Sequence, residues 1–235
     1  MSSKTEKLYT EKGGEYLQRN SDWHVGDSPW KAQQILKMLE RNELQLKSIS
    51  EVGCGAGEIL NQLHAKLPKE IEYTGFDISV DAIELAKPRA KERLYFKLED
   101  FIETASHFDL NLMIDVFEHV DDYLGFLRNC RSKSTYSIFH IPLDMHVQGI
   151  LRLHPTQLRK NLGHLHYYTR ETALATLEDA GYEIIDEFFT AGHMDLQTSL
   201  KAKIKGLPRS ILAAINKPLA VRIFGGFSLL VLTRN

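Results

Sequence analysis

The sequence has few cysteines and almost no net charge. Its 235 residues include only two cysteines, Cys54 and Cys130, and they form no C-x-x-C pair. We therefore expect neither a disulfide framework nor a cysteine-based zinc site, and a reducing compartment fits. Lysine and arginine number 29 against 31 acidic residues, for a formal net charge of −2. This balance does not indicate a nucleic-acid partner.

Long apolar runs are also missing. The longest, around residues 112–117 and 227–232, are too short to cross a bilayer. Residues 1–12 are polar and of mixed charge, and they lack the apolar centre of a signal peptide. We therefore expect a cytoplasmic protein. No internal repeat or Pro/Gly/Ser-rich linker divides the chain, which predicts a single domain over residues 1–235.

Strand-like and helix-like segments alternate along the chain. Short apolar and β-branched runs predict strands at 48–52, 71–77, 94–98, 110–115, 135–141, 183–189 and 227–233. Apolar residues at helical spacing predict helices at 31–41, 58–67, 80–89, 123–130 and 170–180. Because this alternation requires crossover helices, it predicts an α/β fold with a mainly parallel sheet.

Three alternating glycines follow the first predicted strand. The pattern is Glu51-x-Gly53-x-Gly55-x-Gly57, and a predicted helix begins directly after it. Glycine allows a tight turn and a close approach of backbone to ligand, and the start of a helix presents unpaired N–H groups. A dinucleotide-binding loop would place its third glycine where Glu58 stands, so the spacing argues against that class.

This loop resembles the first motif of the class I S-adenosylmethionine-dependent methyltransferases. A carboxylate before the first glycine suits the amino group and sulfonium of S-adenosylmethionine, whereas it would repel a pyrophosphate. The resemblance implies that Glu51, Gly53 and Gly55 contact the methionine part of the cofactor, with Cys54 and Gly57 in the same loop.

Two later motifs are similar to the family's adenosine-binding motifs. Asp77, followed by Ile78, ends the second predicted strand, where the resemblance implies hydrogen bonds to the ribose hydroxyls. The alternative is an acid that caps the helix beginning at residue 80. After the third strand, the resemblance assigns Asp100 to the adenine amino group and Phe101 to the adenine ring, and an ordinary turn is the alternative.

A fourth motif, residues 108–120, is similar to that of small-molecule methyltransferases. It ends in a Glu-His-Val run that is expected to open the next helix. The resemblance implies that Asp115, Val116, Phe117 and His119 face the methionine part of the cofactor or the methyl acceptor. It also implies a doubly wound, Rossmann-like sheet of seven strands with an antiparallel last strand.

The resemblance divides the chain into four parts. They are an N-terminal helical flank or lid at 1–47, a cofactor-binding core at 48–141, a lid insertion at 142–168, and a C-terminal helix and strand pair at 169–235 with a basic insertion at 195–222. We expect methyl transfer from S-adenosylmethionine to a small-molecule acceptor by in-line displacement. The acceptor atom and the oligomeric state stay open.

Histidines near the expected crevice are candidates for a general base, because the histidine pKa lies near working pH. His140, near the end of the fifth strand, and His166, in the lid insertion, are the predicted catalytic residues; His119, His164 and Asp115 are further candidates. Each could instead be hydrogen-bonded structure. We predict no metal, since neither an H-E-x-x-H motif nor a cysteine pair is present.

Other functions remain as alternatives. One is a non-catalytic S-adenosylmethionine-binding subunit, and a less favoured one is a nicotinamide-dependent oxidoreductase. A nucleic-acid methyltransferase is not expected, because the Asn/Asp-Pro-Pro-Tyr/Phe tetrapeptide used on flipped bases is absent from the sequence.

The C-terminal segment is strongly basic. Residues 196–235 contain seven lysines and arginines and no acid, with apolar residues between the cations. Such a segment could rest on an anionic membrane. We favour a helix packed on the edge of the sheet with solvated lysines, and we expect Pro208 and Pro218 to interrupt any long helix.

Overall fold

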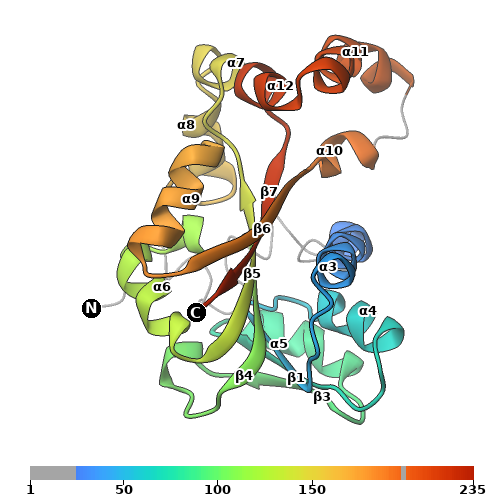
Figure 1. The fold of residues 1–235 in the computed structure, drawn as a ribbon, viewed down its shortest axis with the longest axis vertical. Coiled ribbons are helices and arrows are strands. Elements are labelled where there is room, and N and C mark those ends of the chain that lie inside the picture. Colours follow the sequence, from blue (N-terminus) through green and yellow to red (C-terminus); the bar gives the residue numbers. More distant parts are fainter. Residues whose placement is uncertain (1–24, 197–199) are drawn as a thin grey trace.

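The computed structural model describes residues 25–196 and 200–235 (Figure 1). It contains a seven-stranded sheet in the order β3-β2-β1-β4-β5-β7-β6. The strands are β1 (Ser48–Val52), β2 (Glu72–Asp77), β3 (Leu94–Leu98), β4 (Phe108–Ile114), β5 (Ser134–Pro142), β6 (Glu183–Thr190) and β7 (Ser228–Arg234). The first five strands pair in parallel, and β7 lies antiparallel between β5 and β6. The predicted seven-stranded, doubly wound sheet is confirmed.

Helices cover both faces of this sheet. They are α3 (Ser28–Asn42), α4 (Glu58–Lys66), α5 (Val80–Ala86), α6 (Tyr123–Arg131) and α9 (Arg170–Asp179). Figure 1 shows α3 and α4 on one side of the sheet and α6 and α9 on the other. The predicted helix at 31–41 begins earlier, because Pro29 is tolerated in a first helical turn, where no N–H partner is needed.

The core has two halves, one on each face of the sheet. Leu112 and Ile114 of β4 pack with residues of α3 and α4, whereas Met113 packs with residues of α6 and α9. This division follows from the two-residue period of a strand, which sends successive side chains to opposite faces. The apolar runs that predicted the central strands are therefore strands buried on both sides.

Two predicted helices differ in the structure. The helix predicted over 80–89 ends at Ala86 and continues as the short 3₁₀ segment η2 (Lys87–Arg89), where Pro88 has no backbone N–H to donate. The Glu-His-Val run does not open α6. Glu118 and His119 lie in a separate 3₁₀ turn, η4 (Phe117–His119), and α6 begins at Tyr123.

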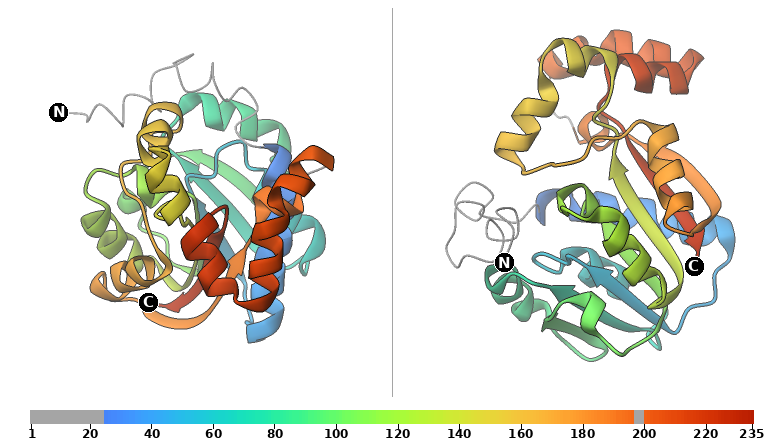
Figure 2. Two further views of the ribbon diagram at one scale, coloured as in Figure 1. Left: turned by 90° about the horizontal axis from the view of Figure 1, so that it is seen from above. Right: turned by 90° about the vertical axis from the view of Figure 1, so that its left-hand side faces the viewer.

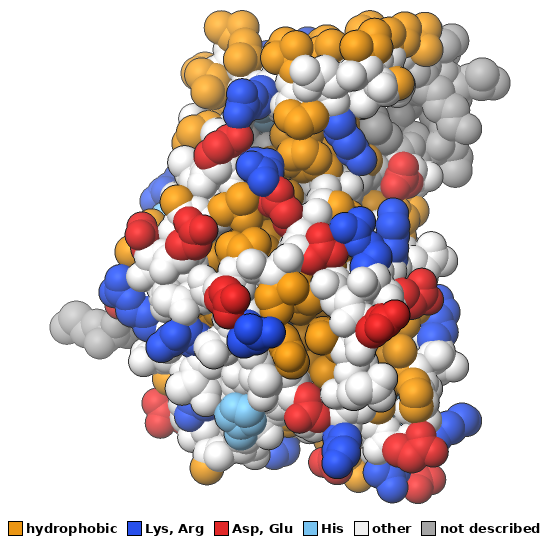
Figure 3. All heavy atoms as spheres, viewed as in Figure 1, with side chains coloured by type: hydrophobic (Ala, Val, Ile, Leu, Met, Phe, Trp, Pro, Cys, Tyr) orange, Lys and Arg blue, Asp and Glu red, His pale blue; other side chains and the backbone are white. Residues whose placement is uncertain are grey.

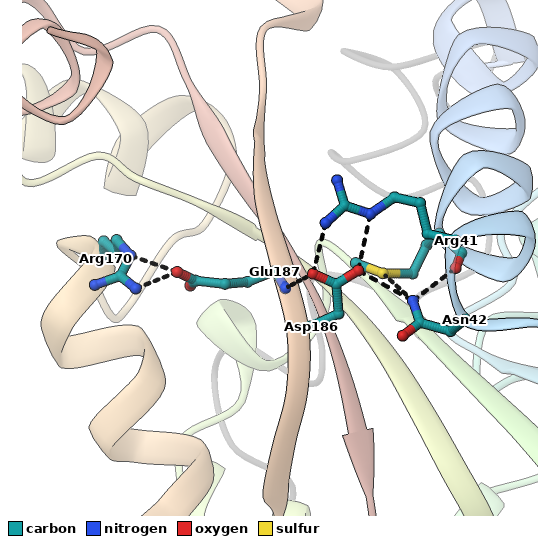
Figure 4. A network of polar contacts seen from close by, with 6 residues as sticks. Arg41, Asn42, Arg170, Asp186 and Glu187 are labelled. Atoms are coloured by element: carbon teal, nitrogen blue, oxygen red, sulfur yellow. Dashed lines mark hydrogen bonds and ion pairs between the residues drawn. The ribbon is translucent and has the colours of Figure 1, made fainter.

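Strand β6 is tied to helices on both sides by ion pairs (Figure 4). Asp186 of β6 accepts hydrogen bonds from Arg41 Nε and Nη2, at 2.9 and 2.8 Å, and from Asn42 Nδ2 at 3.0 Å. The next residue, Glu187, points the other way and pairs with Arg170 of α9. Because one charge lies on each side of β6, the pairing fixes α3 and α9 to opposite faces of the same strand.

The lid insertion and the basic C-terminal insertion together form helices at one end of the sheet. We call α7 (Val147–Leu151), α8 (His154–Asn161), α11 (Leu200–Ile215) and α12 (Lys217–Phe224) the helical cap. Within the cap, α11 packs on α12 and α12 packs on α7. Figures 1 and 2 place the cap beyond the end of the sheet, so the expected packing of α11 on the sheet edge is wrong.

The two prolines of the cap act differently. Pro218 lies in the first turn of α12 and separates it from α11, as predicted, but Pro208 lies inside α11 without ending it. Hydrophobic side chains gather on the cap in Figure 3. They include Leu151, Ile211 and Ile215, which are all exposed. Within the described ranges, 25–196 and 200–235, no helix is long and apolar enough to cross a membrane.

Candidate active site

A cavity of about 620 Å³ opens at the carboxyl ends of the parallel strands. Its walls come from the glycine loop after β1, the residues after β4, the end of β5, the start of α3 and the helical cap. The strand order reverses between β1 and β4, and ligands of open α/β sheets bind outside the strands at such a switch point. The cavity volume is typical of a small-molecule site.

The three glycines of the loop after β1 all have left-handed backbones. Their φ angles are 64° at Gly53, 53° at Gly55 and 74° at Gly57. A Cβ on Gly53 would lie 2.9 Å from Val116 Cγ2, and one on Gly57 would lie 2.4 Å from the Phe96 ring. Conformation and space therefore both require glycine at these two positions.

Glu51 is buried below this loop and also lines the cavity. Its Oε2 has no hydrogen-bond partner among the described residues, and burial raises the pKa of its carboxyl group well above the usual range. An unpaired buried carboxyl group is costly, and a cationic ligand would offset that cost. The environment therefore favours a ligand with positive charge near the end of β1.

Asp77 holds the glycine loop in place. Its Oδ2 accepts the N–H of Gly55 at 2.9 Å, and its Oδ1 accepts the N–H of Ser79 at 2.8 Å. The side chain that caps α5 is Ser79, which accepts the N–H of Ala82. Asp77 does not line the cavity, although its neighbour Ile78 is 43% exposed. Ribose binding by this pair stays a prediction.

The residues assigned to adenine do not line the cavity. Asp100 accepts the N–H of Ile102 and caps the short 3₁₀ segment η3 (Phe101–Glu103). The Phe101 ring is only 2% exposed and lies 5.2 Å from the Phe76 ring, centre to centre. The ring thus belongs to the core of this structure, and the adenine contact stays a prediction.

Asp115 pairs with two other residues at the end of β4. Its Oδ1 accepts a hydrogen bond from His140 Nδ1 at 2.6 Å, and its Oδ2 lies 2.9 Å from Lys31 Nζ. Burial alone would raise the pKa of Asp115, but His140 and Lys31 outweigh it and hold this pKa well below its usual range. Lys31 and His140 therefore favour the ionised form of Asp115. Its backbone is left-handed, with φ 55°, which is uncommon outside glycine.

His140 is fixed on both sides. Because a carboxylate only accepts, Nδ1 carries the proton that faces Asp115, and in the neutral ring Nε2 accepts from Thr190 Oγ1 at 2.9 Å. Thr190 Oγ1 also lies 3.4 Å from the carbonyl oxygen of Ser228. If the hydroxyl turns to that carbonyl, the His140 Nε2 lone pair becomes available. His140 lines the cavity.

The two predicted catalytic histidines therefore differ. His166 does not line the cavity, and its Nε2 donates to the carbonyl oxygen of Val120 at 2.9 Å while its ring packs on Tyr123. This geometry favours a structural role for His166, and its part in catalysis stays a prediction.

Of the residues assigned from the fourth motif, His119 and Asp115 line the cavity. Phe117 is buried between the rings of Phe139 and Tyr168. Val116 contacts Gly53, which brings the loops after β1 and β4 together.

One cluster in the cavity wall was not predicted from the sequence. Glu118, His119 and His164 each offer one ligand atom, and these atoms lie within 4.8 Å of one another. Neither carboxylate oxygen of Glu118 has a hydrogen-bond partner in the described structure, although the residue is fully buried. Burial raises the pKa of Glu118 well above its usual range and lowers the pKa of His119 to about 4. The three side chains could hold a cation.

Comparison with known proteins adds a family and a fold. A family model described as a methyltransferase domain matches residues 28–187. The ubiquinone biosynthesis O-methyltransferase of Histophilus somni is 32% identical over 104 residues, which are 40% of this chain and 42% of that protein. The mitochondrial enzyme of the same name from Candida albicans is 39% identical over 83 residues, 32% of this chain and 25% of that protein. The matches thus span less than half of these relatives.

Solved structures match over nearly the whole chain. Magnesium protoporphyrin IX methyltransferase from Synechocystis PCC 6803, with bound S-adenosylhomocysteine, is similar with a TM-score of 0.62 and 15% identity over 97% of both chains. The N-methyltransferase NodS from Bradyrhizobium japonicum, also with bound S-adenosylhomocysteine, is similar with a TM-score of 0.57 and 17% identity. This match covers 98% of this chain and 96% of that one. At these identities the likeness establishes the fold.

Proposed function

Because the chain belongs to the class I S-adenosylmethionine-dependent methyltransferases, we propose that it transfers the methyl group of S-adenosylmethionine to a hydroxyl oxygen of a small molecule. One observation carries the choice of oxygen. A histidine held by an anion, His140 with Asp115, forms part of the cavity wall beside the glycine loop. A hydroxyl must lose its proton as it attacks, and a histidine in this arrangement takes up protons.

In the proposal, the glycine loop forms the cofactor-binding site. In the proposal, Gly53 and Gly55 let the backbone approach the methionine part of the cofactor, and the buried Glu51 faces its positive charge. Asp77, which keeps the loop in position, binds the ribose. The family's cofactor carries the reactive methyl group, so the protein's own contribution is to position both reactants and exclude water.

The proposed reaction is a single displacement. The acceptor oxygen forms a bond to the methyl carbon while the bond from that carbon to sulfur breaks, and the sulfur keeps the electron pair, which gives S-adenosylhomocysteine. The proton of the hydroxyl passes to His140 Nε2 after Thr190 turns away. Asp115 stabilises the resulting positive charge on His140, as its low pKa keeps it anionic throughout.

The named relatives support a hydroxyl acceptor, since both are O-methyltransferases of ubiquinone biosynthesis. The match covers less than half of either protein, so their acceptors are not transferred to this chain. The acceptor proposed is a small molecule that fits a cavity of about 620 Å³ together with part of the cofactor.

The test is a binding and activity screen. Calorimetry with S-adenosylmethionine and S-adenosylhomocysteine should show one shared site, and nicotinamide dinucleotides should give negligible heat. A metabolite panel with methyl-labelled cofactor should then give labelled methyl ethers. Label found only on nitrogen or carbon would contradict the oxygen acceptor, and binding without any transfer would indicate a non-catalytic subunit.

A further inference from the structure

We propose that Glu118, His119 and His164 bind one divalent transition-metal ion in the cavity wall, and that this ion takes the acceptor oxygen as a further ligand. The second half rests on the proposed function, whereas the first half rests only on the cluster itself. The three residues come from η4 and from the segment between α8 and α9, so the fold and not a local motif brings them together.

The distances suit a site that closes around an ion. The ligand atoms lie within 4.8 Å of one another, and His119 Nε2 lies 3.9 Å from Glu118 Oε1. Metal–ligand bonds of about 2.0–2.2 Å place neighbouring ligand atoms about 3.3 Å apart in a tetrahedral site. Small side-chain rotations would close that difference.

The buried carboxylate points to a ligand. Glu118 is fully buried, and neither Oε1 nor Oε2 has a partner in the described part of the chain. Buried polar groups are ordinarily hydrogen-bonded, and leaving one unpaired costs about 1–3 kcal/mol. The protein keeps this glutamate against a cavity wall that two histidines share, where a cation would satisfy it.

The histidines are held as metal ligands usually are. His164 Nδ1 donates to Asp144 Oδ2 at 2.8 Å, which fixes the tautomer and leaves Nε2 with its lone pair. The His119 ring also hydrogen-bonds to the backbone of Gly163. An outer carboxylate or carbonyl behind each ligating histidine is the common arrangement in metal sites, because it sets the orientation of the ring.

The donor set indicates the class of metal. Two imidazoles and one carboxylate favour Zn²⁺, Mn²⁺, Fe²⁺ or Co²⁺ over Ca²⁺ and Mg²⁺, which prefer oxygen ligands. Three protein ligands leave at least one coordination position open toward the cavity. An acceptor hydroxyl bound there would lose its proton more readily, and it would be positioned for the methyl group.

The experiment is metal titration of the full chain. After chelator treatment, Zn²⁺, Mn²⁺ and Co²⁺ are each added alone and followed by calorimetry, with the visible absorption of Co²⁺ as a spectroscopic signature of histidine ligation. We expect one ion per chain. Glu118→Gln and His164→Ala should each weaken binding at least tenfold, whereas His154→Ala, which changes another cavity histidine outside the cluster, should not.

The outcomes separate this proposal from the proposed function. No saturable one-to-one binding, or equal affinity in wild type and both variants, would overturn the metal site while leaving cofactor binding and methyl transfer to stand. Metal binding that the variants weaken, in a protein that transfers no methyl group, would keep the site and remove the acceptor's role. Circular dichroism of each variant confirms that it is folded.

Discussion

Asp115 and His140 lie 2.6 Å apart, Oδ1 to Nδ1, at the ends of two neighbouring parallel strands. A backbone hydrogen bond also joins the two residues, because the N–H of Asp115 donates to the carbonyl oxygen of His140 at 3.0 Å. The pairing of β4 with β5 places Ile114 opposite His140, so the sheet register brings the carboxylate to the imidazole. A shift of the register by one residue would separate them.

His140→Gln should lower turnover by about 100-fold or more, because glutamine cannot take up the acceptor proton. Affinity for S-adenosylmethionine should stay within about twofold of wild type, since the proposed cofactor contacts come from the glycine loop. Steady-state kinetics and calorimetry measure the two effects. His166→Gln is the matched comparison, and it should leave turnover nearly unchanged. Equal effects of the two substitutions would contradict the assignment of His140.

Asp77→Ala should weaken cofactor binding by about 1–3 kcal/mol, the usual loss when charge-assisted hydrogen bonds are removed. Two causes add here, because the carboxylate supports Gly55 and is expected to accept from the ribose. Ser79→Ala removes the cap of α5 but keeps Asp77, so it should lower the melting temperature with little change in affinity. If both variants bind equally well, Asp77 has only a structural role.

Gly57→Ala should destabilise the fold and weaken cofactor binding. The substitution combines a φ of 74° with a Cβ placed 2.4 Å from the Phe96 ring, so the loop or the ring must move. We expect a loss of about 1–3 kcal/mol in the free energy of unfolding. Gly206→Ala, in α11 with open space around it, is the control and should stabilise the helix by about 0.5–1 kcal/mol. Denaturant unfolding of both variants measures these changes in the free energy of unfolding, and equal values for the two would contradict the prediction.

Glu118→Gln should change how stability depends on pH. Burial raises the folded-state pKa of Glu118, so its protonated form contributes stability that is fully present below the unfolded-state pKa and is lost as pH rises through the folded-state pKa. Glutamine stays neutral. In metal-free protein, the melting temperature of the variant relative to wild type should therefore rise as the pH increases from about 4.3, the usual pKa of a glutamate. A constant difference across this range would show that Glu118 does not titrate there.

The sequence predicted the sheet and the glycine loop because both are local. Strand signals depend on runs of five to nine residues, and the turn after β1 needs glycine at positions that the sequence itself displays. The partners of Asp115 are not local. Lys31 comes from the helix before the sheet, and Thr190, behind His140, comes from β6 near the far end of the chain.

The sequence also could not show which way a side chain points. His164 and His166 are two residues apart in an irregular segment, where spacing does not fix which side chain enters the cavity, and only His164 does. Glu118 was overlooked for a related reason. A glutamate just after a strand suggests a solvent-exposed helix start, and its burial depends on contacts that the sequence does not display.

The place of β7 in the sheet limits how the chain can be shortened. The family match ends at residue 187, inside β6, yet the strand that joins β6 to β5 is β7, at 228–234. A fragment cut at the end of the match would lose that strand and leave the backbone N–H and C=O groups along one side of β5 without partners. Such an open edge is a template for pairing between molecules, so the fragment would self-associate into aggregates. The smallest stable folding unit is therefore longer than the segment that matches the family, because it includes β7.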